Sequence, residues 1–344
     1  MVTGIDDVDT PSEAVDYWVR GTSSFAQGDF KAALRDFDRA LEIHSEYAEA
    51  WNNRGATHLA LGDHARALAD FGRAAEMNPR YAEAHNNCGF VRQATGDHAG
   101  ALADFDRAIE IRPGYAEALS NRGAARHAIE DFEGAILDFD RALAITPDNP
   151  DTCFRRGSAR YASGDYRGAV DDYTHVLTLL PHEATAPVYH DRGVVRIRLR
   201  EFADAVADFD QAIAIDPGFC IAYISRGNAR YHLRDPAGVT DYMVAFRIDR
   251  QRAAGEIIRV LTCGVREDRD DVLENCRQHL RICPDDLIAY ARRGLSLLIL
   301  GREREAAEDF KQIAARSTDP EFRRHLALLV KSARRRDTIF SAIP

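Results

Sequence analysis

Glycine recurs along this chain at intervals of 34 residues, and this period constrains the fold more than any other feature. The glycine series runs Gly21, Gly55, Gly89, Gly123 and Gly157, and it resumes at Gly193, Gly227 and Gly294. A series of small residues keeps nearly the same period, at Ala33, Ala67, Ala101, Ala135, Ala169, Ala205 and Ala306. An aromatic series and a proline series follow it, beginning at Phe37 and Pro79. Such a period indicates repeated supersecondary units and not one compact core.

Each series fits one part of a helix–turn–helix unit. Glycine and alanine allow two antiparallel helices to cross closely, and the aromatic residue fills the space beside the crossing. Proline ends the second helix, because it lacks a backbone N–H and restricts the residue before it. Between the two helices a glycine suits the end of one helix and an aspartate caps the start of the next. These pairs are Gly28-Asp29, Gly62-Asp63, Gly96-Asp97 and Gly164-Asp165.

The four series together resemble the tetratricopeptide repeat family, whose unit is a 34-residue helix–turn–helix. The resemblance covers roughly residues 14–320 and gives nine units, which start near Ala14, Ala48, Ala82, Ala116, Pro150, Ala186, Cys220, Ala253 and Leu287. It implies an all-α, right-handed superhelical solenoid with a C-terminal capping helix. We expect an acidic tail (1–13), six regular units (14–219), two distorted units (220–286), a final unit (287–320), and a capping helix with a basic and apolar tail (321–344).

Composition narrows the class of function. The 344 residues are 45% hydrophobic and 29% charged, which excludes a disordered chain, and no apolar run is long enough to insert into a membrane. A net charge of −10 argues against a nucleic-acid partner. The acidic N-terminus lacks the apolar core of a signal peptide, so we expect a cytoplasmic, bacterial protein. The excess of arginine over lysine indicates high-GC codon usage and not a function. No catalytic motif or strand pattern is present, so we expect no enzyme, cofactor or metal site.

Arginine precedes the glycine in nearly every unit, where the family often has leucine. An aspartate follows 16 residues later, on the second helix. We predict one structural ion pair per unit, in the pairs Arg20–Asp36, Arg54–Asp70, Arg122–Asp138, Arg156–Asp172, Arg192–Asp208 and Arg293–Asp309, with Arg226–Asp241 one residue closer. Such pairs fix helix register more than they stabilise. The alternative is an arginine row that binds an anion. Cys88 replaces the arginine in the third unit, so Asp104 needs another donor.

Two residues before the glycine, three successive units carry asparagine. The position is similar to the asparagine ladder of the O-linked N-acetylglucosamine transferase repeats, whose amides hold the backbone of an extended peptide. By this resemblance Asn53, Asn87 and Asn121 are candidate peptide-binding residues, and the neighbouring Asn52 and Asn86 extend the amide surface. An amide both donates and accepts, so it can satisfy a peptide group without reading the side chain. The alternative is a row of polar residues that faces water.

Two further groups complete the candidate site. An acidic row, Glu49, Glu83, Glu117 and Asp151, would favour a basic or neutral segment if it borders the groove, and otherwise forms a solvated face. Phe154 and Tyr161 could form side-chain pockets, or could instead belong to the core between units.

We therefore expect a non-catalytic scaffold or adaptor that binds a peptide or protein in its concave groove. One alternative is a regulatory subunit that holds an enzyme or effector through residues 220–286. The other is a self-assembling solenoid and homo-oligomer, because residues 1–13 carry a charge of −4 (four acids) and residues 321–344 carry +4 (six bases, two acids).

Overall fold

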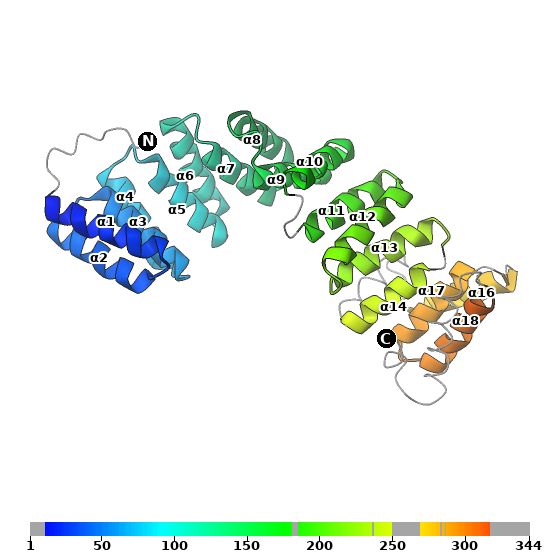
Figure 1. The fold of residues 1–344 in the computed structure, drawn as a ribbon. Helices are drawn as coiled ribbons and strands as arrows, with labels where there is room; N and C mark the ends of the chain where they lie inside the picture. The colour runs from blue at the N-terminus through cyan, green and yellow to red at the C-terminus, as the bar shows by residue number, and fades with distance from the viewer. Residues whose placement is uncertain are drawn as a thin grey trace. The chain divides into compact units, whose positions relative to one another are not determined.

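The computed structural model describes residues 11–316, except residues 181–184, 236, 250–268, 283 and 286. Within those residues every regular element is an α-helix and no strand occurs, which confirms the all-α fold. The chain divides into two compact units, Met1–Gly164 and Asp165–Pro344 (Figure 1).

The first unit contains nine helices among its described residues. They are α1 (Ser12–Ala26), α2 (Phe30–Ile43), α3 (Ala48–Ala60), α4 (His64–Met77), α5 (Ala82–Ala94), α6 (His98–Ile111), α7 (Ala116–Ala128), α8 (Phe132–Ile145) and α9 (Pro150–Ser163). The second unit begins with α10 (Tyr166–Leu179), α11 (Ala186–Arg198), α12 (Phe202–Ile215), α13 (Cys220–His232) and α14 (Gly238–Ile248). Its later described helices are α16 (Arg269–Ile282), α17 (Leu287–Ile299) and α18 (Glu303–Arg316).

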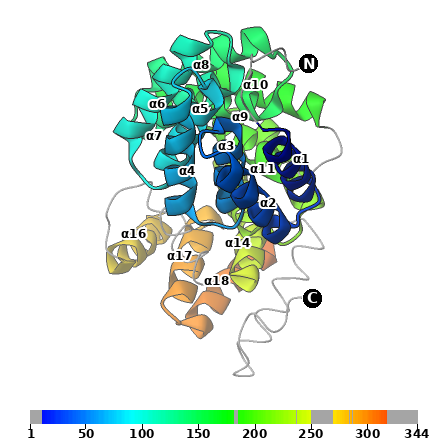
Figure 2. The ribbon, with the colours of Figure 1, turned by 90° about the vertical axis from the view of Figure 1, so that its left-hand side faces the viewer.

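The helices pack in consecutive pairs, as α1 and α2 do side by side in Figure 1 and Figure 2. The repeated glycine of the first helix lies against the repeated aromatic ring of the second. A Cβ atom added at Gly89 would lie 2.7 Å from Cε1 of Phe105, and the same clash arises at Gly55, Gly123, Gly193 and Gly294. The rings of Phe37, Phe71, Phe105, Phe139 and Phe209 are buried. The predicted close crossing is therefore present.

The turn between paired helices has the predicted glycine and aspartate. Gly62 adopts a φ of +79° and Asp63 accepts a hydrogen bond at 3.0 Å from the backbone N–H of Arg66. Asp29, Asp97, Asp131 and Asp165 cap their helices in the same way. Three turns place Glu130, Arg200 and Arg234 in the left-handed conformation instead of glycine, with φ between 59° and 65°.

Within the described part of each compact unit, first helices of successive pairs also contact one another. In the first unit these contacts join α1 to α3, α3 to α5, α5 to α7 and α7 to α9, while the second helices make no contacts of comparable extent among the described residues. The first helices therefore line the side on which successive pairs approach most closely. We call this side of the first unit, formed by α1, α3, α5, α7 and α9, the inner face.

Several expectations fall outside the described residues. These are most of the acidic tail, the capping helix, and the first helix of the eighth repeat within residues 250–268. In the seventh repeat the second helix, α14, is 11 residues long, whereas the second helices of the first six repeats have 14 residues. The division into regular and distorted units stays a prediction.

Candidate functional site

Amide side chains on the inner face bond to one another across helices. The amide of Asn87 on α5 donates to the side-chain oxygen of Asn52 on α3 at 2.9 Å. Asn52 donates in turn to Asn53 at 3.4 Å, and Asn53 donates to the hydroxyl of Thr22 on α1 at 3.3 Å. One chain of hydrogen bonds thus links three consecutive first helices.

A second series of side-chain hydrogen bonds continues along α5, α7 and α9. Arg155 donates to the side-chain oxygen of Asn121 at 3.4 Å, and Asn121 donates to Asn86 at 3.0 Å. Asn86 then donates to the carboxylate of Glu117 at 3.3 Å. In both series the asparagine of one pair donates to the asparagine oxygen of the preceding pair, as Asn87 does to Asn52 and Asn121 does to Asn86.

These bonds divide the predicted peptide-binding asparagines into two groups. Asn52, Asn86 and Asn121 are only 8%, 1% and 8% exposed, and they join consecutive helices. They do not provide the accessible amide surface that the sequence pattern suggested. Asn53 and Asn87 remain partly exposed. The side-chain oxygen of Asn87 and one of its two N–H groups have no partner among the described residues.

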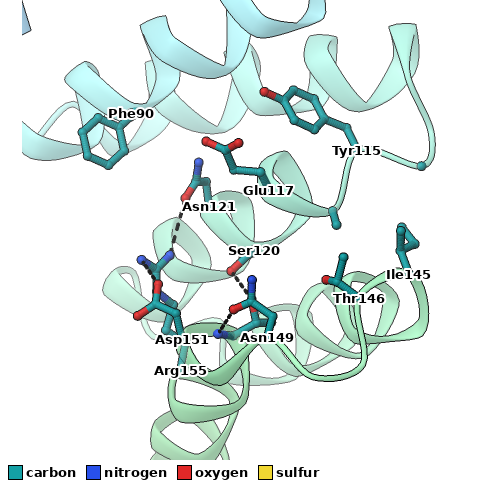
Figure 3. Close-up of a pocket in the computed structure, with 13 residues that line it drawn as sticks. Phe90, Tyr115, Glu117, Ser120, Asn121, Ile145, Thr146, Asn149, Asp151 and Arg155 are labelled. Atoms are coloured by element: carbon teal, nitrogen blue, oxygen red, sulfur yellow. Dashed lines mark hydrogen bonds and ion pairs between the residues drawn. The ribbon is translucent and has the colours of Figure 1, made fainter. Parts of the chain in front are cut away.

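An open pocket of about 650 Å³ lies on the inner face beside this second series of hydrogen bonds (Figure 3). It forms where the start of α7, the end of α8 and the start of α9 meet, and Phe90 of α5 closes one side. The hydroxyl of Thr152 donates to Ser120 at 3.1 Å, and Arg155 pairs with Asp151 at 2.8 Å. The remaining lining residues are Gly114, Tyr115, Ala116, Glu117, Asn121, Ile145, Thr146 and Asn149.

Two members of the predicted acidic row, Glu117 and Asp151, line the pocket. Glu117 is exposed in the pocket, Asp151 is paired with Arg155, and Glu83 pairs with Arg112. The pKa of the Tyr115 phenol is raised, first by burial and then by the charges of Glu117 and Glu83. The pKa of Tyr81 is raised likewise, by burial and then by Glu49 and Glu83. The row therefore acts on neighbouring side chains as a local negative potential.

The predicted arginine–aspartate pairs lie between the two helices of a unit. Arg54 donates to Asp70 through Nε at 2.9 Å and through Nη2 at 2.7 Å, and Arg122 contacts Asp138 at 2.8 and 2.6 Å. The same two-bond contact joins Arg20 to Asp36, Arg192 to Asp208, and Arg293 to Asp309. The aspartates are buried, with Asp138 at 0% exposure.

Two of these predictions differ in detail. Arg226 reaches Asp241 by two hydrogen bonds to a single oxygen, at 3.1 and 2.6 Å. Arg156 belongs to the first compact unit and Asp172 to the second, so their pairing stays a prediction.

Four of these arginines also bind an acid of the preceding pair, which the sequence reasoning missed, whereas Arg192 binds the hydroxyl of Thr174 at that place. Arg54 contacts Asp38 at 2.7 Å through its remaining Nη1, and the same bond recurs in Arg122–Asp106, Arg156–Asp140 and Arg226–Asp210. The arginine therefore bridges two successive pairs. The signal in the sequence is the recurring Asp-aromatic-Asp triplet, whose second acid makes this contact.

A second arginine row, one helical turn further on, was also missed. Arg126, Arg196 and Arg230 contact the same buried aspartates as the first row, at 2.7–2.8 Å. In the third repeat, Arg92 supplies the missing donor, because it pairs with Asp104 where Cys88 cannot. The preceding repeat has Gly72 at the position where Asp38, Asp106, Asp140 and Asp210 are the bridging acids, so the loss of the arginine leaves no second acid unpaired.

Phe154 and Tyr161 lie on α9 and are both partly buried. Neither lines the pocket. Their predicted role as side-chain pockets stays a prediction.

Among the described residues, no three His, Cys, Asp or Glu side chains come together in a way that could hold a metal ion. No helix in the described part of the chain has both the length and the apolar character needed to cross a bilayer.

Comparison with known families identifies the repeat. Four tetratricopeptide repeat models match, over residues 21–62, 48–81, 89–150 and 186–219. The chain is therefore a tetratricopeptide repeat protein. No curated protein sequence matches it.

Solved structures show the same fold at low sequence identity. The chain is similar to a tetratricopeptide repeat protein from Parabacteroides merdae ATCC 43184, with a TM-score of 0.54 and 16% identity over 73% of this chain and 100% of that one. The chain is also similar to Pseudomonas aeruginosa PilF, with a TM-score of 0.54 and 17% identity over 60% of this chain and 93% of that one. A chain of the APC/C hetero-tetramer Cut9-Hcn1 has a TM-score of 0.54 and 14% identity over 73% of this chain and 53% of that one. At these identities the likeness establishes the fold alone.

Proposed function

We propose that this protein is a non-catalytic scaffold or adaptor whose inner face binds an extended peptide or protein segment. The observation that carries the proposal is Asn87, which is partly exposed and anchored by its bond to Asn52. Its free oxygen and N–H can accept from and donate to one peptide group.

The surroundings of Asn87 support the same function. Most of the face is held in place before binding, because the amide chains and the ion pairs fix consecutive helices to one another. A preformed surface loses little conformational entropy when a ligand binds, which leaves more of the contact energy for affinity. The pocket beside Asn121 adds a concave site for a side chain of the same segment.

Affinity capture from a lysate of the producing organism tests the proposal. The bait would be wild type beside Asn53→Ala/Asn87→Ala, with Leu137→Ala as a matched control on the second helix α8, where Leu137 is 59% exposed. Circular dichroism melts would verify that all three proteins fold. We expect a partner that wild type and the control retain and the double variant loses. A partner held equally by all three proteins would refute binding through the amides.

The alternatives concern other parts of the chain. A regulatory subunit acting through residues 220–286 would retain its partner in the double variant. Binding would then map to that segment. A self-assembling solenoid would show a mass that rises with concentration and falls with salt, because the charged ends would drive it.

A further inference from the structure

Phe90 is an unusual residue on the inner face. It follows the repeated glycine of α5, a position held by Thr22, Ala56, Ala124 and Ser158 in the other first helices of the first unit. Its ring is 44% exposed, although an aromatic residue of this size is normally buried. The ring lines the pocket and lies one helical turn beyond Asn87.

The opposite part of the pocket is negatively charged. In Figure 3 the Glu117 carboxylate lies between Phe90 and the ring of Tyr115. The lining contains two carboxylates, Glu117 and Asp151, and one guanidinium, Arg155, which gives a net charge of −1. Arg155 is already bound to Asp151 at 2.8 Å and to Asn121 at 3.4 Å. Glu117 receives only the 3.3 Å bond from Asn86, so most of its acceptor capacity is free.

We propose that Phe90 and Glu117 form a subsite for a basic side chain, lysine or arginine, of the segment bound on the inner face. The inference rests on the proposed function and names the chemistry of its ligand. The exposed ring offers its negative π-face to the cation, and the carboxylate offers an ion pair at the same pocket. An aromatic ring and carboxylates together bind an arginine elsewhere in this protein. Cζ of Arg54 lies 4.5 Å from the centroid of the Trp51 ring while its guanidinium binds two aspartates.

The pocket argues against the other side-chain classes. An acidic side chain would meet Glu117 and would find Arg155 already neutralised. An apolar side chain would fill the space beside Phe90 but would leave the Glu117 carboxylate with the bond from Asn86 alone. The raised pKa of Tyr115, caused first by burial and then by Glu117, agrees with a negative potential in the pocket.

A phage-displayed random dodecapeptide library, panned on the full chain, tests the subsite. The baits would be wild type, Glu117→Lys, Asn87→Ala and Phe90→Leu, which keeps an apolar side chain but removes the ring. We expect wild type to select peptides with Lys or Arg at one fixed position, and Glu117→Lys to lose that preference or change it to an acid. A synthetic selected peptide should bind Glu117→Gln and Phe90→Leu roughly fivefold more weakly than wild type.

The outcomes separate this inference from the proposed function. If peptides selected by wild type show no basic position, or if Glu117→Lys selects the same basic residue, the subsite is refuted. In that case loss of the peptides by Asn87→Ala would still support binding on the inner face. If no bait, wild type included, selects any peptide, the proposed function is contradicted as well. Circular dichroism melts of each variant exclude unfolding as the cause.

Discussion

At the scale of single residues, Cys88 shows how the chain accommodates the loss of a repeated arginine. The thiol is 4% exposed and packs with Ala67, Phe71 and Val91. Arg92 then becomes the charged partner of Asp104, whose side chain is 15% exposed. Burial raises the pKa of Asp104, and Arg92 opposes that shift. The pair therefore keeps a carboxylate charged in a place that disfavours its charge.

Replacement of this arginine should be costly. We expect Arg92→Leu to lower the free energy of unfolding by about 2 kcal/mol at pH 7, because it leaves the Asp104 carboxylate without its guanidinium partner. Urea unfolding measures the loss. The double variant Arg92→Leu/Asp104→Asn should lose less. Arg107→Ala, at an exposed pair with Glu110, is the control and should change stability by less than about 0.5 kcal/mol. An equal loss in the single and double variants would contradict the account.

The same substitution should make stability depend on pH in a defined direction. Without Arg92 the folded-state pKa of Asp104 rises further above its unfolded value, so the folded state binds the proton more tightly. Stability of the variant relative to wild type should then improve as pH falls from 7 towards 4, where Asp104 is protonated and needs no cation. Unfolding curves at several pH values measure this change. A deficit that is constant with pH would show that the Arg92 contribution is packing and not charge.

The Cys88 thiol should be chemically inert in the folded protein. Burial, and then the charge of Asp104, raise its pKa to about 12, so almost no thiolate is present at neutral pH. We expect iodoacetamide to label Cys88 at least tenfold more slowly in native protein than in urea, as measured by peptide mass spectrometry. Similar rates in the two conditions would contradict the buried environment.

At the scale of helices, the turn between paired helices shows where sequence and conformation disagree. Four turns in the first five repeats use glycine in the left-handed conformation, but the fourth uses Glu130 at a φ of 65°. A side chain in this conformation costs about 1–2 kcal/mol. Part of that cost is offset, because glycine loses more backbone entropy on folding.

Glu130→Gly should therefore stabilise the protein by about 0.5–1 kcal/mol. The substitution removes an exposed side chain and leaves the cap of α8 by Asp131 unchanged. Thermal unfolding measures the gain. Gly62→Ala is the reciprocal control and should destabilise, because its φ is +79°. No gain in Glu130→Gly would mean that the side chain makes an interaction that offsets its backbone strain.

At the scale of the whole chain, the sequence predicted the contacts that lie within a single repeat. The glycine–aromatic crossing, the capped turns and the arginine–aspartate offset all lie within one pair of helices, so their spacing is fixed along the sequence. The contacts between pairs were harder to predict. Arg54–Asp38 and Asn121–Asn86 depend on how one pair rotates against the next, which a 34-residue period does not reveal. For this reason Asn86 and Asn121 were expected on the accessible surface although the structure buries them.

These contacts between pairs connect successive repeats of the first compact unit. Bridging arginines join α2 to α3, α6 to α7 and α8 to α9, and the amide chains join the first helices on the inner face. At α4–α5 the bridging charges are replaced by the apolar contact of Cys88 with Phe71. Stability in repeat proteins depends on such interfaces between neighbours, and the proposed ligand-binding surface is the face that they hold in place.

Photo-crosslinking from two positions tests the central claim, binding on the inner face, most directly. p-Benzoylphenylalanine would replace Phe90 on the inner face or Leu137 on α8, both of which are exposed, and the protein would be irradiated with the captured partner or a selected peptide. The account predicts a crosslink from position 90 and none from position 137. A crosslink from position 137 alone would place the ligand on the second helices and would contradict the account.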